Sequence, residues 1–435
     1  MIATPLTGLL GVGVLLALLL LGMPIGIALG LVGVGGLALT LGLEPGLLKG
    51  GIVLFETLSR YELGTLPLFM LMAHLCFAAE ASRDFFDAAA RFLGHRRGGL
   101  AIASVAGCAG FGTINGSSLA TTATIGLVAL PEMRNRGYAD SLATGCVAAG
   151  GTLGQMIPPS GSLIVFGIIA EQSIGSLFTA AIVPGLTQML SYFLVIAVLV
   201  RLRPQLAPPS PRAPWAQRLA ALKRIADLGI LILLVIGGIS IGWFTPPEAA
   251  SVGAVGALLI CARRRRLNRR TLVTALEETL KTSGLIYLVV IGALTFSVFI
   301  SVTGLTEAIG AQIAALGAGP VTTMMLIAAF LLVVGSVLDG LALMLLTTPI
   351  LLPIVAQLGL SPIWFGIFLV RAMEIGFVHP PLGMNLYVIQ GVAKDVPLGR
   401  IFRGVLPFLA ADLVHLMLLI VFPVIALGLP RWLSP

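Results

Sequence analysis

Two groups of hard oxygen ligands stand beside interruptions in apolar segments of this sequence. The first group comprises Asn115, Ser117 and Ser118, and the second contains Ser336 and Asp339. Hydroxyl, amide and carboxylate oxygens, together with backbone carbonyl groups that a helix break sets free, suit a small cation such as Na⁺. The residue types therefore predict cation binding rather than covalent chemistry.

A Pro-Pro pair interrupts an apolar segment in each half of the chain. Pro158-Pro159 recurs as Pro380-Pro381 after about half the length of the sequence. Such a pair removes two backbone donors and cannot lie inside a continuous helix. In a bilayer this break is tolerated only where protein or a cavity surrounds it. Paired broken helices in corresponding halves of an apolar chain predict a secondary transporter and mark its binding site.

We expect one Na⁺ site in each half, where a polar hairpin tip meets a broken helix. Glycine at these points lets the backbone approach an ion closely. Asp339 supplies the only carboxylate between Glu307 and Glu374, and an ionisable residue inside a membrane is functional by default. The predicted ligands are Gly112, Asn115, Gly116, Ser117, Ser118, Pro159 and Gly161 in the first half, and Ser336, Asp339, Gly340, Pro380, Gly383 and Asn385 in the second.

A carboxylate substrate is expected near the half-helices that follow the breaks, because their N-terminal ends carry free amides and a positive dipole end. The candidate residues are Ser160, Ser162, Arg371 and His379. Arg371 can instead pair with Glu374, three residues on. His379 can titrate or coordinate a ligand, or it can bond to freed backbone. Small hydroxyl residues also pack membrane helices without binding anything.

The composition sets the class of protein that must position these residues. The chain has 435 residues, of which 58% are hydrophobic and 10% charged, with a mean hydropathy of +1.07. No soluble domain of this size has such a composition, so the chain is predicted to be an all-α polytopic membrane protein. The net charge of +8 favours basic loops that fix orientation over nucleic-acid binding. Residues 6–21 lack a cationic leader and a cleavage site, which predicts a first membrane helix rather than a signal peptide.

The remaining sequence signals argue against a cysteine metal site and against ATP as the energy source. Cys76, Cys108, Cys146 and Cys261 lack ligand spacing, and we interpret them as ordinary residues of the membrane core. The sequence contains no G-x-x-x-x-G-K-[S/T] pattern for ATP phosphates. Energy is therefore expected from an ion gradient or a partner.

Clusters of Arg and Lys predict which loops face the cytoplasm. The uncharged segment 98–131 carries a basic cluster at each end, so both its ends are placed on that side. Each arm has about a dozen residues, roughly 18 Å at 1.5 Å per residue, which is too short for a full crossing. The segment is therefore predicted to be a re-entrant hairpin with an irregular tip at 110–118.

The rest of the first repeat, 1–200, follows from the same rule. A Pro-rich basic linker at 201–224 then separates it from the second repeat. The predicted elements are crossings at 6–21, 25–41 and 65–80, an interfacial helix at 43–62, a broken crossing at about 138–172 and a return at 175–200.

The second repeat, 225–435, is predicted to have the opposite topology. This arrangement places all but four of the 26 Arg and Lys residues in the cytoplasm and both termini outside. It is an inverted-topology repeat with two re-entrant hairpins and two Pro-Pro-broken helices. Its predicted elements are crossings at 227–243, 248–262, 284–301 and 403–428, an interfacial helix at 263–283, a hairpin at about 319–354 with its tip at 335–340, and a broken helix at about 362–395.

Five motifs in these segments resemble one family, the large membrane (permease) subunit of tripartite ATP-independent periplasmic (TRAP) transporters, in the wider ion-transporter superfamily. The resemblance covers essentially the whole chain, and the combination of motifs is specific. The motifs are Gly-Phe-Gly-Thr-Ile-Asn-Gly-Ser-Ser at 110–118, Ile-Pro-Pro-Ser at 157–160, Ser-Ile-Gly-Ser-Leu-Phe at 173–178, Asp339 followed by Thr-Pro-Ile-Leu-Leu-Pro at 348–353, and Pro-Pro-Leu-Gly-Met-Asn-Leu-Tyr-Val at 380–388.

This resemblance implies Na⁺-coupled uptake of a small organic acid across the bacterial inner membrane by an elevator-type motion of the hairpin domain. It also implies two partners, a small four-helix membrane subunit and a periplasmic substrate-binding protein. The chain is too short to contain that small subunit as a fusion, so we expect it as a separate chain. Where the family commonly has Thr, this sequence has His379.

Two alternative functions remain at this point. An autonomous ion-coupled anion carrier or ion antiporter of the same fold would need no binding protein. An intramembrane enzyme would need a catalytic constellation, yet Asp339 has no second membrane aspartate nearby and no Ser–His pair has supporting context. We therefore expect no enzymatic activity and no cofactor, with Na⁺ as the coupling ion.

The first prediction tests the re-entrant hairpin by cysteine accessibility. Because both ends of 98–131 are placed in the cytoplasm, Arg97→Cys and Glu132→Cys should react with an impermeant thiol reagent from the same side of the membrane. Labelling from opposite sides would show a full crossing and would contradict the hairpin.

Overall fold

The computed structural model describes residues 4–315, 317–336 and 338–433, and these residues form helices and connecting loops without a strand. Among them, five helices are long and apolar enough to cross a membrane. A sixth span results if α8 and α9, which meet at 41° across a four-residue break, count as one. The prediction of an all-α polytopic chain is confirmed in this respect.

The helices divide into two successive series along the chain. The first series contains α1 (Pro5–Leu20), α2 (Ile25–Leu41), α3 (Leu43–Leu58), η1 (Tyr61–Gly64), α4 (Thr65–Ala78), α5 (Ala81–Leu93), α6 (Gly99–Asn115), α7 (Ser118–Asn135), α8 (Asp140–Met156), α9 (Gly161–Ile169) and α10 (Ile174–Leu202). The second contains η2 (Pro204–Leu206), α11 (Trp215–Ser240), α12 (Pro246–Arg263), α13 (Arg269–Thr303), α14 (Leu305–Ala315), α15 (Pro320–Gly335), α16 (Gly340–Gln357), α17 (Pro362–Val378), α18 (Met384–Val392), α19 (Leu398–Val421) and α20 (Val424–Leu433).

Helix boundaries recur at the same spacing as the prolines. Each end of α7 lies a fixed number of residues before the matching end of α16, and the ends of α8 lie the same number before those of α17. That number equals the spacing of the two Pro-Pro pairs. Both Pro-Pro bonds are cis. The contacts between helices repeat as well. The contact of α2 with α13 corresponds to that of α12 with α4, and the contact of α7 with α18 corresponds to that of α16 with α9. These matches support the two-repeat interpretation, and the opposite insertion of the repeats stays a prediction.

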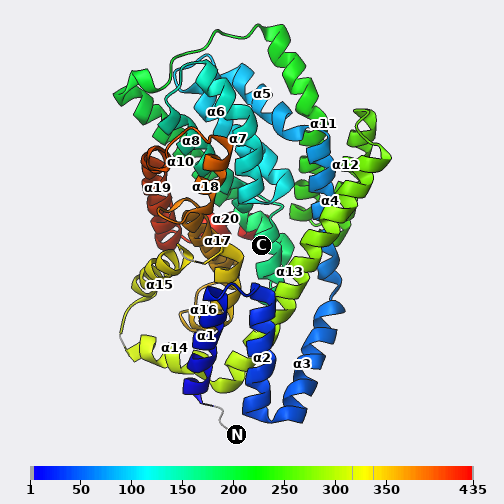
Figure 1. The fold of residues 1–435 in the computed structure, drawn as a ribbon, viewed down its shortest axis with the longest axis vertical. Coiled ribbons are helices and arrows are strands. Elements are labelled where there is room, and N and C mark those ends of the chain that lie inside the picture. Colours follow the sequence, from blue (N-terminus) through cyan, green and yellow to red (C-terminus); the bar gives the residue numbers. More distant parts are fainter. Residues whose placement is uncertain (1–3, 316, 337, 434–435) are drawn as a thin grey trace.

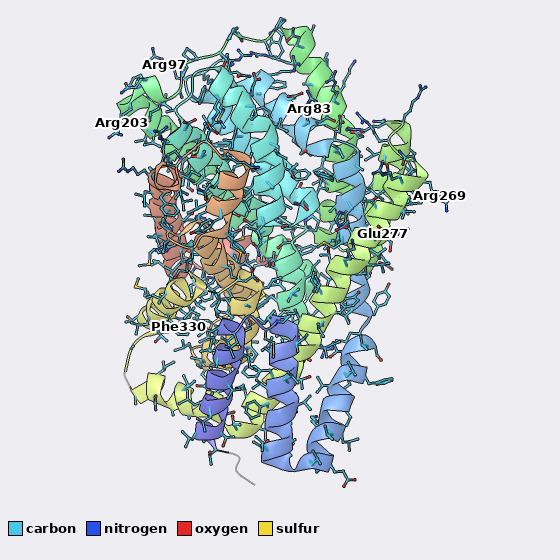
Figure 2. The ribbon with its side chains drawn as sticks, in the orientation of Figure 1. Arg83, Arg97, Arg203, Arg269, Glu277 and Phe330 are labelled. Carbon is cyan, nitrogen blue, oxygen red and sulfur yellow. The ribbon has the colours of Figure 1, made fainter. Side chains whose placement is uncertain are left out.

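The molecule is elongated (Figure 1). Helices α1, α2 and α3 lie at one end, while α5, α6 and the start of α11 lie toward the other. Arg83, Arg97, Arg203 and Arg269 all lie in the half away from the N-terminus (Figure 2). This distribution supports the placement of these basic loops on one side of a membrane.

The first hairpin has a shorter irregular tip than predicted. Only Gly116 and Ser117 separate α6 from α7, whereas the sequence predicts an irregular segment over 110–118. Gly112 lies inside α6 and packs closely against α8, since a Cβ there would lie 2.4 Å from the Gly154 Cα. The arms have 17 and 18 residues, so the expectation of a dozen residues per arm is wrong. The short-arm argument for a re-entrant segment is weakened accordingly.

Residues 269–303 form one continuous helix, α13, in place of the predicted interfacial helix 263–283 and crossing 284–301. The first half breaks at the equivalent place because Pro67 lacks a backbone N–H and opens a new helix, α4, within its first turn. No proline interrupts α13, and Gly284 has open space around it. The two halves therefore differ here for a local, single-residue reason.

The Pro-rich linker is also shorter than predicted. Helix α11 begins at Trp215, so residues 215–224 are helical and the irregular connection, interrupted by η2, covers 203–214. The segment 215–224 is rich in Ala, Leu, Lys, Arg and Gln, which all favour helix. Pro214 precedes it in an extended conformation that suits a helix start.

The second prediction concerns the close contact of α6 with α8. Gly112→Ala should lower the free energy of unfolding by about 1–3 kcal/mol, because the added methyl overlaps the Gly154 backbone. The control is Gly13→Ala in α1, where a Cβ meets nothing within 4 Å. Thermal unfolding in detergent measures both variants, and an equal effect of the two would contradict the packing argument.

Candidate functional site

The first hairpin tip touches the first helix break through backbone atoms. Gly116 has φ 63°, a left-handed conformation that favours glycine. A Cβ at this position would lie 2.9 Å from the Pro159 carbonyl oxygen and 3.3 Å from the Gly161 nitrogen. The structure thus brings together three residues of the predicted first ion site and leaves no room for a side chain between them.

The side chains of this first junction hold the half-helices in place. Ser117 caps α7 by accepting from Ala120 N at 3.4 Å, and Ser160 caps α9 by accepting from Leu163 N at 3.4 Å. The Asn115 amide reaches Thr121 Oγ1 at 3.5 Å, at the limit of a hydrogen bond. These bonds satisfy donors that a helix start otherwise leaves free.

Ser160 and Ser162, two of the predicted substrate residues, are both buried. Ser162 accepts a hydrogen bond from the Gln155 side chain across the break, joining α8 to α9. Each hydroxyl therefore has a structural partner here, and substrate contact by these two residues stays a prediction.

The second hairpin meets α17 in the corresponding way. Asp339 caps α16 by accepting from Leu341 N at 3.1 Å, and Ser336 donates to Val333 O at 2.7 Å. A Cβ on Gly340 would lie 2.8 Å from the Phe377 ring. Val337, within the predicted tip, lies outside the described residues.

Past the second break, the chain folds back tightly on the end of α17. A Cβ on Gly383 would lie 2.7 Å from the Phe377 carbonyl oxygen. Gly383 precedes α18 and supplies no side-chain cap. The start of α18 therefore keeps its backbone amides free of any side-chain cap, in contrast to α7, α9 and α16.

Asn385 follows the second break in the chain, but its side chain bonds to the first hairpin and to α8. Its Nδ2 donates to Ser118 Oγ at 2.9 Å and to Ala148 O at 3.0 Å. Its side chain and that of Ser118 are buried. The sequence interpretation assigned these residues to separate sites, whereas the structure joins them through the contact of α18 with α7 and α8.

A second tie holds α7 against the end of α18. Arg134 near the end of α7 bonds to Asp395 at 3.1 Å and to Asp140 at 3.0 Å, and Asp140 also pairs with Arg400 at 3.2 Å. The hydrogen bond from Arg134 lowers the pKa of the exposed Asp395 carboxyl. Helices α7 and α18 are therefore linked near both of their ends.

Arg371 lies away from these junctions and is fully buried. It donates to Glu374 Oε2 at 2.9 Å, to Asp412 Oδ1 at 2.5 Å and to His415 Nδ1 at 3.1 Å. The pairing with Glu374 is the alternative that the sequence left open, and contact with a substrate is not available to Arg371 in this conformation. Asp412 was missed, although an acidic residue inside the apolar segment 398–421 was a signal for it.

His379 ends α17 at the second break, close to the uncapped start of α18 in the chain. Its Nδ1 is buried and has no hydrogen-bond partner. An imidazole nitrogen and free helix-start amides near each other are the polar groups with which this break can meet an anion.

Comparison with known proteins identifies the family. The sequence profile of the tripartite ATP-independent periplasmic transporter, DctM component, matches residues 12–425. The chain belongs to this family. The permease is 35% identical to the C4-dicarboxylate TRAP transporter large permease protein DctM of Pseudomonas aeruginosa, over 88% of this chain and 89% of that one.

A second relative and a solved structure also resemble the chain. The sialic acid TRAP transporter large permease protein SiaM of Vibrio cholerae is 32% identical, over 96% of both chains. The crystal structure of the Alcanivorax borkumensis YdaH transporter matches with a TM-score of 0.61 at 18% identity, covering 99% of the permease and 100% of that chain. The permease is thus a multi-pass membrane transport protein, and its fold is shared with a solved transporter.

The third prediction tests the bond between the halves. Asn385→Ala should lower the free energy of unfolding by about 1–3 kcal/mol, because it leaves the Ser118 hydroxyl and the Ala148 carbonyl buried without their donor. A double-mutant cycle with Ser118→Ala, read by thermal unfolding, should give a coupling of about 0.5–3 kcal/mol.

The matched control is Ser336→Ala, whose hydroxyl bonds to Val333 O within its own helical turn. It should change stability little. Additive effects of the Asn385 and Ser118 variants would contradict the link.

Proposed function

We propose that the permease couples uptake of a small organic acid to a Na⁺ gradient. The observation that carries this proposal is the junction of Gly116 with Pro159 and Gly161, where irregular backbone from a hairpin meets irregular backbone from a broken helix. Uncapped carbonyl groups at such a junction are suitable cation ligands, and paired junctions of this kind mark transporter binding sites.

Asp339 distinguishes the second proposed Na⁺ site from the first. It is half-buried at the tip between α15 and α16, and its carboxylate already holds the start of α16. A carboxylate at this depth is favourable only with a compensating charge, and Na⁺ provides one. The remaining predicted ligands at the two junctions are part of the same proposal.

The substrate carboxylate is proposed to bind at the second break. The start of α18 has no side-chain cap, and His379 Nδ1 has no partner there. Relatives are named for C4-dicarboxylates and for sialic acid, which are both carboxylates, and this supports an acid as substrate without naming which one. Arg371 is not required for this site because its donors are already engaged.

We further propose that the hairpins, the broken helices and α10 and α19 move together against α1–α4 and α11–α13. The two series of helices would insert with opposite topology in a bacterial inner membrane, with both termini periplasmic. The recurrence of helix boundaries at the interval of the Pro-Pro pairs and the gathering of labelled arginines away from the N-terminus support this arrangement.

Two partners complete the proposal, a small membrane subunit and a periplasmic substrate-binding protein. The family to which the chain belongs is described as tripartite, which supports both. An autonomous carrier without a binding protein is the competing function, and an enzyme is disfavoured because the relatives are permeases.

The fourth prediction concerns Na⁺. In proteoliposomes that contain the complete transporter, uptake of the accepted acid should require an inward Na⁺ gradient. Asp339→Asn should raise the Na⁺ concentration for half-maximal uptake by about tenfold, which corresponds to ~1.4 kcal/mol of lost cation binding. Uptake is measured with a panel of radiolabelled organic acids, because the substrate is to be identified in the same experiment.

The outcomes separate the competing functions. Full activity with K⁺ in place of Na⁺ would overturn the coupling. Comparable uptake by the membrane subunits without any binding protein would establish an autonomous carrier. Ser160→Ala serves as a comparison, since loss of a helix cap should slow uptake without altering the Na⁺ dependence.

A further inference from the structure

A buried polar network lies where α8, α10, α17 and α19 pack together. It contains two carboxyl groups, Glu374 and Asp412, but one permanent cation, Arg371. All three side chains are fully buried. With both carboxyl groups ionised the network would carry a net negative charge in the buried interior, which is strongly unfavourable.

His415 does not supply the missing positive charge. Its Nδ1 accepts from Arg371 Nε at 3.1 Å, so that nitrogen carries no hydrogen. The ring hydrogen is therefore on Nε2, which lies 2.8 Å from Thr187 Oγ1. The Thr187 hydroxyl donates in turn to backbone carbonyl groups of α10. His415 is thus a neutral imidazole that donates on one side and accepts on the other.

Unpartnered oxygens show where a hydrogen is missing. Three oxygens of the network are buried without a hydrogen-bond donor, namely Glu374 Oε1, Gln188 Oε1 and Asp412 Oδ2. The Gln188 amide lies beside the Glu374 carboxyl group. Its nitrogen has no hydrogen left for Glu374, because it donates to Thr152 Oγ1 at 3.0 Å and to Tyr192 Oη at 3.1 Å. A hydrogen on Glu374 would relieve this excess of acceptors.

The opposite orientation of the Gln188 amide gives up one of these bonds. It would place Oε1 against Thr152 Oγ1, whose own hydrogen already goes to Ala149 O at 2.7 Å. Two acceptors would then face each other at that contact instead. The observed orientation keeps both amide hydrogens bonded to hydroxyl oxygens, and with this orientation the missing hydrogen is one on the carboxyl group.

Arg371 bonds to both carboxyl groups, to Asp412 Oδ1 at 2.5 Å and to Glu374 Oε2 at 2.9 Å. The other neighbours of the two carboxyl groups distinguish them. Tyr192 stands beside Asp412 and can turn its hydroxyl hydrogen from Thr152 Oγ1 to that carboxylate, whereas the amide hydrogens beside Glu374 are already engaged. Asp412 is therefore the counter-ion, and Glu374 is the acid that keeps a proton.

We propose that Glu374 is a proton-binding site, held as a neutral carboxylic acid while α8, α10, α17 and α19 are packed together. The titratable groups facing it are Arg371 on its own helix, Asp412 and His415 on α19, and Tyr192 on α10. No group of three or more His, Cys, Asp or Glu side chains converges to bind a metal ion in the described part of the chain. A proton taken from solvent therefore balances the network better than a metal cation.

A consequence for stability follows from the bound proton. The unfolded chain exposes Glu374 as an ionised carboxylate at neutral pH, so folding takes up one proton at this site. Stability from this source is present at mildly acidic pH and decreases as the pH rises, because the folded state binds more protons than the unfolded state. This inference does not depend on the transported ion or substrate.

The decisive measurement is infrared difference spectroscopy of the purified permease. Wild type minus Glu374→Gln should show the carbonyl stretch of a protonated carboxylic acid at neutral pH. The band should shift when glutamate is labelled with ¹³C and stay unchanged when aspartate is labelled. Absence of the band, or a shift with labelled aspartate alone, would overturn the assignment.

Two variants provide independent checks. Asp412→Asn should remove the band as well, because Glu374 then becomes the one counter-ion of Arg371 and must ionise. Glu374→Gln mimics the neutral acid, so its melting temperature should fall less than that of wild type between mildly acidic and mildly alkaline pH. An equal pH dependence of Glu374→Gln and wild type would contradict the proposal.

The matched control is Glu278→Gln. Glu278 is partly exposed and pairs with Lys281 at 2.9 Å on α13. This variant should retain both the band and the pH dependence of wild type, which separates loss of one buried proton from loss of any carboxyl group.

Discussion

The rest of the structure depends on the need to cover the two Pro-Pro interruptions with protein. Hydrocarbon offers no water to the backbone groups that these prolines leave without helical partners. The first interruption is covered by the tip of the α6–α7 hairpin, and the contact is so close that Gly116 cannot carry a side chain. The hairpin, its glycine and the broken helix are therefore one structural unit, and the same irregular backbone is where we propose that an ion binds.

The two halves share this plan but differ in the polar groups that complete it. Neutral hydroxyl groups cap α7 and α9, a carboxylate caps α16, and no side chain caps α18. A carboxylate attracts a cation, whereas free amides at a helix start attract an anion. Near-symmetric backbones can in this way offer different ligands without any change of fold.

The halves are interlocked rather than placed side by side. Helix α18 lies on α7 and α8, and Asn385 and Asp395 bond to residues of the first half. The Arg371 network also joins α10 of the first half to α17 and α19 of the second. Hydrogen bonds and ion pairs thus link these helices at several places. Because buried polar bonds are costly to break, such links favour movement of the helices as a unit over rearrangement among them.

The sequence by itself determined the class, the positions of the breaks and the candidate ion ligands. Composition and proline spacing act locally, so they could be read without knowing which helices meet. Local signals also misled, because Gly112 resembles a loop residue until Gly154 is seen against it, and α13 has no proline to end it.

Tertiary structure alone decided which distant residues share a bond. Ser118 meets Asn385, and Arg371 meets Asp412, across 267 and 41 residues. The physical reason is that a helix sequence shows which faces are polar but not which neighbour those faces meet. That choice follows from packing of the whole bundle.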